Sequence, residues 1–204
     1  MQTIPEPVDH PAGLPPLPGR PFRGLLPTIR FATGSVFVIL GLAALTGLST
    51  GQDWLARGAA DWVPMDMVSA LVFLLFGSIM MISRSNLARE ASWVLMLAIG
   101  SLSLVQGYIA GWSGDADPAL SQTGHWLRPV PAFLFFITGI RIYCATRRAA
   151  LAPVLDGVIL GLAVPALLGY MANFAPLYQS SIFHGISVIE ALGFSVLGAL
   201  FLLA

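Results

Sequence analysis

The chain has 204 residues, of which 56% are hydrophobic and only 10% are charged, and its mean hydropathy is +0.81. A soluble domain carries about 25% charged residues, so this composition excludes an ordinary soluble protein and predicts an integral membrane protein. Ten basic and ten acidic residues give a formal net charge of zero, which excludes the basic footprint of a nucleic-acid-binding protein.

The first 30 residues hold eight of the fifteen prolines. Such a segment has too few apolar residues to form a core, so we expect an extended or disordered tail over residues 1–30. It does not read as a signal peptide, because no apolar stretch follows a short basic start before residue 31. The tail is expected to tether the membrane domain on its cytoplasmic side.

Six apolar runs follow, each long enough or nearly long enough to cross a bilayer as a helix. They predict an all-α membrane domain over residues 31–204, with six transmembrane helices. Short loops pair the helices into three tandem helical hairpins, 31–82, 91–145 and 153–204. The six predicted spans are 31–50, 64–82, 91–112, 127–145, 153–174 and 183–204.

The arginines predict how these spans are oriented. Eight of them fall on one side of the predicted topology: Arg20, Arg23, Arg30, Arg84, Arg89, Arg141, Arg147 and Arg148. Only Arg57 and Arg128 fall on the other side. Because basic loops stay in the cytoplasm, both ends of the chain are predicted to be cytoplasmic.

The second helix of each predicted hairpin carries the same apolar frame, Ala-x-x-Phe-x-x-x-Gly, with steps of 62 and 59 residues between copies. Positions 0, +3 and +7 share one face of a helix, so each copy presents a small, a large and a small residue along one stripe. Small residues let helices approach closely in lipid, which predicts a packing seam and a tandem internal repeat. The copies are Ala70, Phe73 and Gly77; Ala132, Phe135 and Gly139; and Ala191, Phe194 and Gly198.

Polar residues recur at fixed distances before the shared alanine. Four residues before it stand Asp66, Arg128 and Ser187, and one residue before it stand Ser69, Pro131 and Glu190. Seven residues before it stand Val63, His125 and His184. If the copies pack around a common axis, the ionisable members of these columns gather beneath the outer loops.

Glu190 is the deepest of these groups, and an ionised carboxylate inside a membrane needs a partner or a proton. Arg128 is the predicted partner. A structural ion pair and a ligand-binding or proton-sensing group are both open readings of this pair. His125 and His184 are candidate ligands of a metal or haem, but two histidines lack a third ligand, and interfacial hydrogen bonding is the favoured reading.

No other chemistry is indicated. Asp156 is expected to pair with Arg147 and Arg148, which follow the fourth span. The single Cys144 excludes an intrachain disulfide and a cysteine-based metal site. No phosphate-binding loop, HExxH motif or catalytic triad occurs, so we predict no enzyme activity, no metal and no cofactor, with haem or quinone as the alternative.

Two segments carry a family resemblance: PMDMVSALVFLLFGSIMM, from Pro64, and HGISVIEALGFSVLGALFLL, from His184. They resemble the multi-pass membrane sensor region that precedes histidine kinase, PAS or diguanylate cyclase output domains in bacterial receptors. The resemblance implies a sensor in the bacterial inner (cytoplasmic) membrane. The given sequence departs from that pattern because it holds no output domain after the sixth span. The chain is therefore expected to be either the sensory part of a longer protein or a free-standing membrane subunit, and the family supplies no defined ligand residues.

The leading hypothesis is therefore a signal-input module. A lipid, a quinone or a small hydrophobic molecule, within the bilayer or at its periplasmic face, would shift the packing between hairpins, in a homodimer or a larger membrane complex. The alternative is an accessory subunit of a larger energy-transducing or pigment-protein complex. Transport of a small solute is less favoured, because the spans offer few midplane polar residues and no broken helix pair.

Overall fold

The computed structural model of the chain describes residues 26–59, 62–82, 86–112, 127–147, 149–174, 176–177 and 185–203. Every regular element in these residues is a helix, so the all-α prediction agrees with the part of the chain that is described. Residues 1–25 of the predicted tail lie outside the described residues, and so do His125 and His184.

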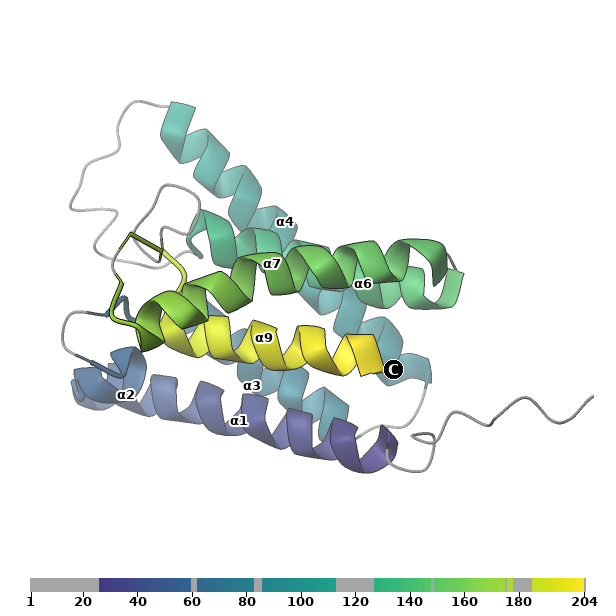
Figure 1. Cartoon of the computed structure of the whole chain (residues 1–204), viewed down its shortest axis with the longest axis horizontal. Coiled ribbons are helices and arrows are strands. Elements are labelled where there is room, and N and C mark those ends of the chain that lie inside the picture. The colour runs from purple at the N-terminus through teal and green to yellow at the C-terminus, as the bar shows by residue number, and fades with distance from the viewer. Residues whose placement is uncertain are drawn as a thin grey trace, which may run out of the picture.

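Three long helices alternate with three shorter ones along the chain (Figure 1). The long helices begin at or close to the predicted cytoplasmic arginines, and the shorter ones return from the opposite end. A short helix, α2, and a single turn of 3-10 helix, η1, complete the described elements. The bounds are α1 Leu26–Thr50, α2 Asp53–Arg57, α3 Met67–Ile82, α4 Asn86–Trp112, α6 Pro129–Arg147, η1 Ala149–Leu151, α7 Ala152–Met171 and α9 Val188–Leu203.

The long helices have the length and the apolar composition needed to cross a membrane. Among the described residues, three segments are long and apolar enough to do so: Pro27–Thr50, Arg89–Tyr108 and Ala152–Met171. The other three apolar helices are shorter, and α3 and α9 have 16 residues each. At 1.5 Å per residue, 16 residues reach about 24 Å, against a hydrocarbon core of about 30 Å. Of the six expected spans, three helices therefore have the length and composition of a membrane span.

Each long helix packs antiparallel against the shorter helix that follows it, and we call these pairs the first (α1 with α3), second (α4 with α6) and third (α7 with α9) hairpins. Glycine makes the close approach in the first hairpin: a Cβ on Gly77 would lie 2.6 Å from the carbonyl oxygen of Gly34. Gly139 lies equally close to the backbone of Leu97, and Gly198 faces the side chain of Leu160. The last residue of each frame therefore packs inside its own hairpin.

The middle residues of the frames meet at the centre of the bundle. Phe73, Phe135 and Phe194 are fully buried, and their ring centroids lie 5.9, 5.7 and 5.0 Å apart in the three pairings. The ring of Phe73 also covers Gly193, where a Cβ would lie 2.4 Å from the ring. The helices α3, α6 and α9 run in the same direction (Figure 1), and the contact of the three rings places their frames at one level.

The alanines of the frames occupy matching positions on these three helices. Ala70, Ala132 and Ala191 are all fully buried. Each amide N–H donates to the carbonyl of the residue four positions earlier, which immediately precedes the helix. The three helices thus begin with the same geometry, and the residues just before them are brought to one end of the bundle.

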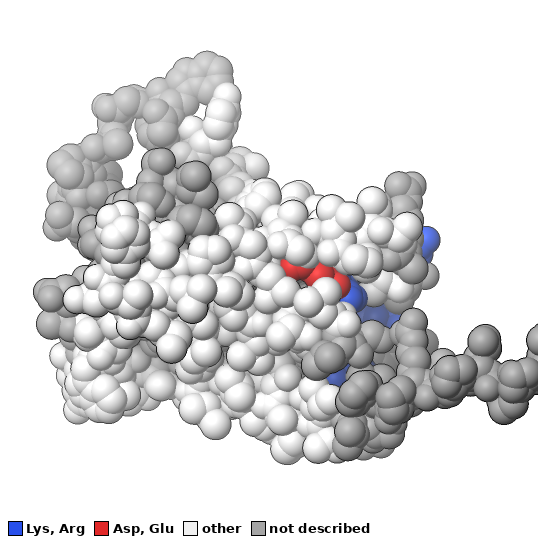
Figure 2. All heavy atoms as spheres, in the orientation of Figure 1, with Lys and Arg blue, Asp and Glu red and all other residues white. Residues whose placement is uncertain are grey.

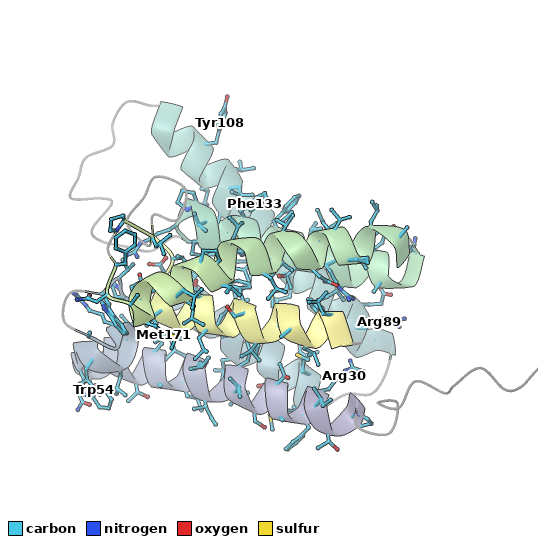
Figure 3. The ribbon with its side chains drawn as sticks, viewed as in Figure 1. Arg30, Trp54, Arg89, Tyr108, Phe133 and Met171 are labelled. Carbon is cyan, nitrogen blue, oxygen red and sulfur yellow. The ribbon has the colours of Figure 1, made fainter. Side chains whose placement is uncertain are left out.

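The two ends of the bundle differ in their side chains (Figures 2 and 3). Arg30 and Arg89 lie at the end where α9 finishes, whereas Trp54 and Met171 lie at the opposite end. The charged side chains visible in Figure 2 gather toward the first of these ends, and the rest of the described face is uncharged. We call the end with Arg30 and Arg89 the base and the end where α3, α6 and α9 begin the rim.

Candidate functional site

The rim is built from the three residues that precede α3, α6 and α9. These residues are Asp66, Arg128 and Ser187. Since the helices are parallel and level, their first turns converge, and side chains that are about 60 residues apart in sequence come into contact. Asp66 and Ser187 are buried, while the Arg128 side chain keeps 32% of its surface exposed.

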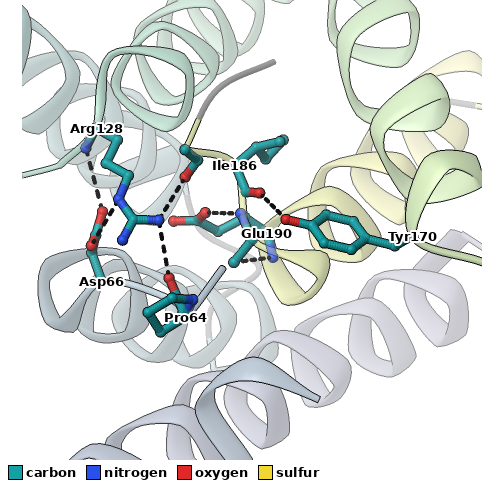
Figure 4. Close-up of polar contacts among 8 residues, drawn as sticks. Pro64, Asp66, Arg128, Tyr170, Ile186 and Glu190 are labelled. Atoms are coloured by element: carbon teal, nitrogen blue, oxygen red, sulfur yellow. Dashed lines mark hydrogen bonds and ion pairs between the residues drawn. The ribbon is translucent and has the colours of Figure 1, made fainter. Parts of the chain in front are cut away.

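Arg128 connects all three hairpins at the rim (Figure 4). Its Nε lies 3.8 Å from Oδ1 of Asp66, and its backbone N–H donates to Oδ2 of the same carboxylate at 3.3 Å. Its Nη1 donates to the carbonyl of Pro64 at 3.4 Å and to the carbonyl of Gly185 at 3.3 Å. One side chain of the second hairpin therefore binds groups of the first and the third.

Gly185 makes room for this arginine. Its φ is +91°, in the left-handed region that disfavours a side chain. A Cβ at this position would also lie 2.5 Å from Cδ of Arg128, so the aliphatic part of the arginine rests on the glycine backbone. Both the backbone turn and the contact with Arg128 require glycine here.

The structure corrects the predicted partner of Glu190. Arg128 forms its ion pair with Asp66, not with Glu190. The carboxylate of Glu190 instead accepts the backbone N–H of Ser187 through Oε2 at 2.8 Å, and the Ser187 hydroxyl accepts the N–H of Glu190 at 3.1 Å. This reciprocal pair is a capping box, which closes the first turn of α9. Glu190 therefore bonds within its own helix, because the free backbone N–H groups at the start of α9 need an acceptor.

The other oxygen of Glu190 points toward α3. Oε1 and the Ser69 hydroxyl are both buried and have no hydrogen bond of good geometry among the described residues. The hydroxyl is nevertheless close enough to interact with the carboxyl group, and the Asp66 carboxyl is a further neighbour. Glu190 is fully buried, so this corner holds a carboxyl group whose second oxygen lacks a hydrogen bond.

Burial also acts on Asp66, which precedes the apolar part of α3. Loss of solvent raises the pKa of this carboxyl, while the charge of Arg128 and its backbone N–H oppose that shift. A change at Arg128 therefore changes how readily Asp66 ionises. The rim couples the charge state of one hairpin to the position of another.

Tyr170 supports the rim from the third hairpin. Its buried hydroxyl donates to the carbonyl of Ile186 at 2.7 Å, just before the capping box. Its ring packs against Trp62 with centroids 5.2 Å apart. These contacts hold the segment that carries Gly185 and Ser187 against the end of α7.

A second polar junction lies toward the base, and sequence analysis did not single it out. Arg141 of α6 donates from Nε to Oδ1 of Asp156 at 2.7 Å and from Nη2 to Oδ2 at 3.2 Å. Nη2 also donates to the carbonyl of Phe201 at 3.1 Å, and the guanidinium lies 4.2 Å from the Phe201 ring centre. The expectation that Asp156 pairs with Arg147 is wrong, because Asp156 pairs with Arg141 and Arg147 stacks on Tyr143. Arg148, the other expected partner, lies outside the described residues.

The position of Asp156 explains that correction. The carboxyl of Asp156 lies one turn inside α7, and the residue is 2% exposed. It therefore faces the interior of the bundle rather than the turn between α6 and α7. Arg141 is a full turn and a half before the end of α6 and is also buried. A signal for this pair was present, because an arginine inside an apolar run needs a partner among the neighbouring helices.

The described residues contain no group of three or more His, Cys, Asp or Glu side chains that could hold a metal ion. Of the five predicted ligand or ion-pair residues, Asp66 and Arg128 are paired and Glu190 adjoins them, while His125 and His184 lie outside the described residues. The chain matches no protein-family model, no curated protein and no solved structure.

Proposed function

We propose that the chain is a membrane-embedded signal-input module. In this proposal six helices cross the cytoplasmic membrane of a bacterium as three copies of a two-helix unit, with both ends of the chain in the cytoplasm. A stimulus shifts how the three hairpins pack, and that shift is the signal. The arginines at the base and the tryptophan at the rim support this orientation.

The matching positions of the three frames support the repeat. Three alanines with the same backbone hydrogen bond, three phenylalanines in mutual contact and three glycines facing the preceding helix follow one plan. Repeats with the same orientation pack around an axis along the membrane normal. Such a bundle has equivalent seams, along which one hairpin slides or tilts against the others.

The observation that carries the proposal is that α6 fastens the hairpins at both ends. At the rim, Arg128 binds Asp66 of the first hairpin and the Gly185 carbonyl before α9 of the third. Toward the base, Arg141 binds Asp156 and Phe201 of the third hairpin. Between these two junctions the three phenylalanine rings of the frames pack against one another. Movement of a hairpin must therefore exchange specific charged contacts, which favours discrete arrangements over gradual deformation.

Distances between hairpins in a lipid nanodisc test the proposal. Spin labels would replace exposed residues in a chain that carries Cys144→Ala: Trp54 and Met171 at the rim, or Ile82 and Leu202 at the base. Stimuli to compare are pH, anionic lipid and a quinone. We expect at least one stimulus to change the distance between two spin labels by about 2 Å or more. Arg128→Gln should produce the same change in the absence of that stimulus.

The exposed Arg147→Gln is the matched control, since it removes one charge from α6 without touching either junction. It should leave both distances unchanged. If every stimulus and Arg128→Gln leave one invariant distance distribution, the signalling proposal is overturned. Co-purification with a partner at a fixed ratio would then identify the chain as an accessory subunit of a larger complex.

A further inference from the structure

A cavity of about 250 Å³ opens at the base between the hairpins. Its walls come from five helices and include side chains of all three hairpins. The lining residues are Arg30, Phe76, Met80, Arg89, Ser92, Arg141, Ile142, Ala145, Leu200 and Phe201. The rim junction described above contributes nothing to this cavity.

The polar part of the wall is strongly cationic. Arg30 of α1, Arg89 of α4 and Arg141 of α6 all line the cavity, and no acidic side chain lines it among the residues that the structure describes. Asp156 pairs with Arg141 and lies outside the lining, so the guanidinium groups of Arg30 and Arg89 are the further cationic groups of the wall. Figure 3 shows Arg30 and Arg89 at the same end of the bundle.

The remaining wall is apolar. Phe76, Met80, Ile142, Leu200 and Phe201 are hydrophobic, and most of them are buried members of the bundle core or pack against it. A cavity with cationic and apolar walls fits a ligand that has an anionic head and a hydrocarbon tail. Guanidinium groups suit phosphate in particular, because their planar donors bind two oxygens at once.

We propose that this cavity binds the anionic head group of a membrane phospholipid. The phosphate would lie between Arg30 and Arg89, with the Ser92 hydroxyl as a further polar group, and the first acyl carbons would lie along Phe76 and Leu200. The volume is smaller than the roughly 300 Å³ of a typical small-molecule site, so it accommodates a head group and not a whole lipid. Basic pockets between membrane helices on the cytoplasmic side bind such head groups.

The proposal requires that the bundle lies in a bilayer but not that it signals. Its failure is therefore distinguishable from that of the proposed function, which depends on hairpin movement. A soluble phosphate compound carries the same negative charge as the lipid head group but has no acyl chains. The test must separate a bilayer phospholipid from a soluble phosphate.

Native mass spectrometry of the purified full chain measures retained lipid directly. We expect phosphatidylglycerol to be retained at one site in preference to phosphatidylcholine, and glycerol 3-phosphate without acyl chains not to compete. Arg30→Gln with Arg89→Gln should weaken the first phosphatidylglycerol affinity about tenfold or more, through the loss of two charge-assisted contacts. Binding of glycerol 3-phosphate in place of the lipid would overturn the lipid assignment.

Two further variants protect the test. Arg147→Gln removes a charge from the same end of α6 outside the cavity and should leave the affinity within about twofold. Ala145→Trp fills the cavity from an exposed position without removing charge, and it should also abolish retention. Unchanged retention in the double arginine variant or in Ala145→Trp, or an equal loss in Arg147→Gln, would overturn the proposal.

Discussion

Arg141 and Asp156 form a two-pronged ion pair between α6 and α7, with N to O distances of 2.7 and 3.2 Å. Both side chains are buried, and the same guanidinium also binds the carbonyl of Phe201 on α9. The pair therefore joins two hairpins through groups that have little access to water. Breaking one half of such a pair leaves an uncompensated charge in an apolar interior.

Single substitutions should thus be more harmful than the double substitution. Arg141→Leu or Asp156→Leu should lower the free energy of unfolding by about 3 kcal/mol, whereas the two together should recover much of that loss. Thermal unfolding in detergent, followed by circular dichroism, compares the three variants. If the double variant lost as much free energy of unfolding as the two single variants lose together, the two charges would be energetically independent.

The apolar frame is the feature that sequence analysis predicts most directly. Spacings of three and four residues determine which side chains share a helix face, so Ala70, Phe73 and Gly77 could be assigned to one stripe without coordinates. The structure places Phe73 against Phe135 and Phe194 at one level. Each of the three helices starts three residues before its alanine, so the frames occupy the same place in their helices.

The polar partners were predicted less well, for two different reasons. Glu190 was assigned to Arg128 although a Ser-x-x-Glu signature at Ser187 already indicated a local capping box. Asp156 was assigned to the nearest arginines in sequence, but its true partner depends on how α6 and α7 are rotated about their axes. The periodicity of one helix does not show how that helix is rotated relative to its neighbour. The only sequence signal for Arg141 as the partner is the free-energy cost of an arginine inside an apolar run.

Substitutions of Glu190 distinguish the capping box from an ion pair. Glu190→Gln keeps an oxygen for the Ser187 N–H and brings an amide N–H₂ beside the Ser69 hydroxyl, so stability should be unchanged or higher. Glu190→Ala removes the acceptor and should cost about 1 kcal/mol, as should Ser187→Ala. Thermal unfolding in detergent measures all three. Strong destabilisation by Glu190→Gln would instead indicate that the negative charge is required.

Asp66 should make stability depend on pH in a defined direction. Burial raises its pKa above the ordinary value of 3.8, so the folded chain holds the proton more tightly than the unfolded chain. The contribution of Asp66 to stability is therefore complete below that value and is lost as pH rises through the raised pKa. The stability of Asp66→Asn relative to the parent chain should therefore increase as pH rises from below 3.8 to above it.

Arg128→Gln provides the internal check on that dependence. The arginine lowers the pKa of Asp66 against the effect of burial, so its removal should extend the loss of stability to higher pH. Melting temperatures of the parent, Asp66→Asn and Arg128→Gln chains across this range give the comparison. A constant difference between the parent and Asp66→Asn at every pH would contradict a raised pKa at Asp66.

The centre of the bundle can be tested by two phenylalanines on the same helix. Phe135 is fully buried between Phe73 and Phe194, whereas Phe133, two residues earlier on α6, is 38% exposed. Phe135→Ala would leave a cavity that neither neighbour can fill, and it should cost about 3 kcal/mol. Phe133→Ala removes the same atoms from a face that lipid can cover, so it should cost under about 1 kcal/mol.

The reason for the difference is packing rather than transfer from water. Lipid tails are as apolar as the side chains, so the free energy lost at Phe135 comes from dispersion contacts that nothing replaces. Unfolding in detergent micelles and in nanodiscs should therefore rank the two variants identically. If Phe133→Ala proved as harmful as Phe135→Ala, α6 would have to turn its other face inward, and the contact of the three rings could not hold the hairpins together.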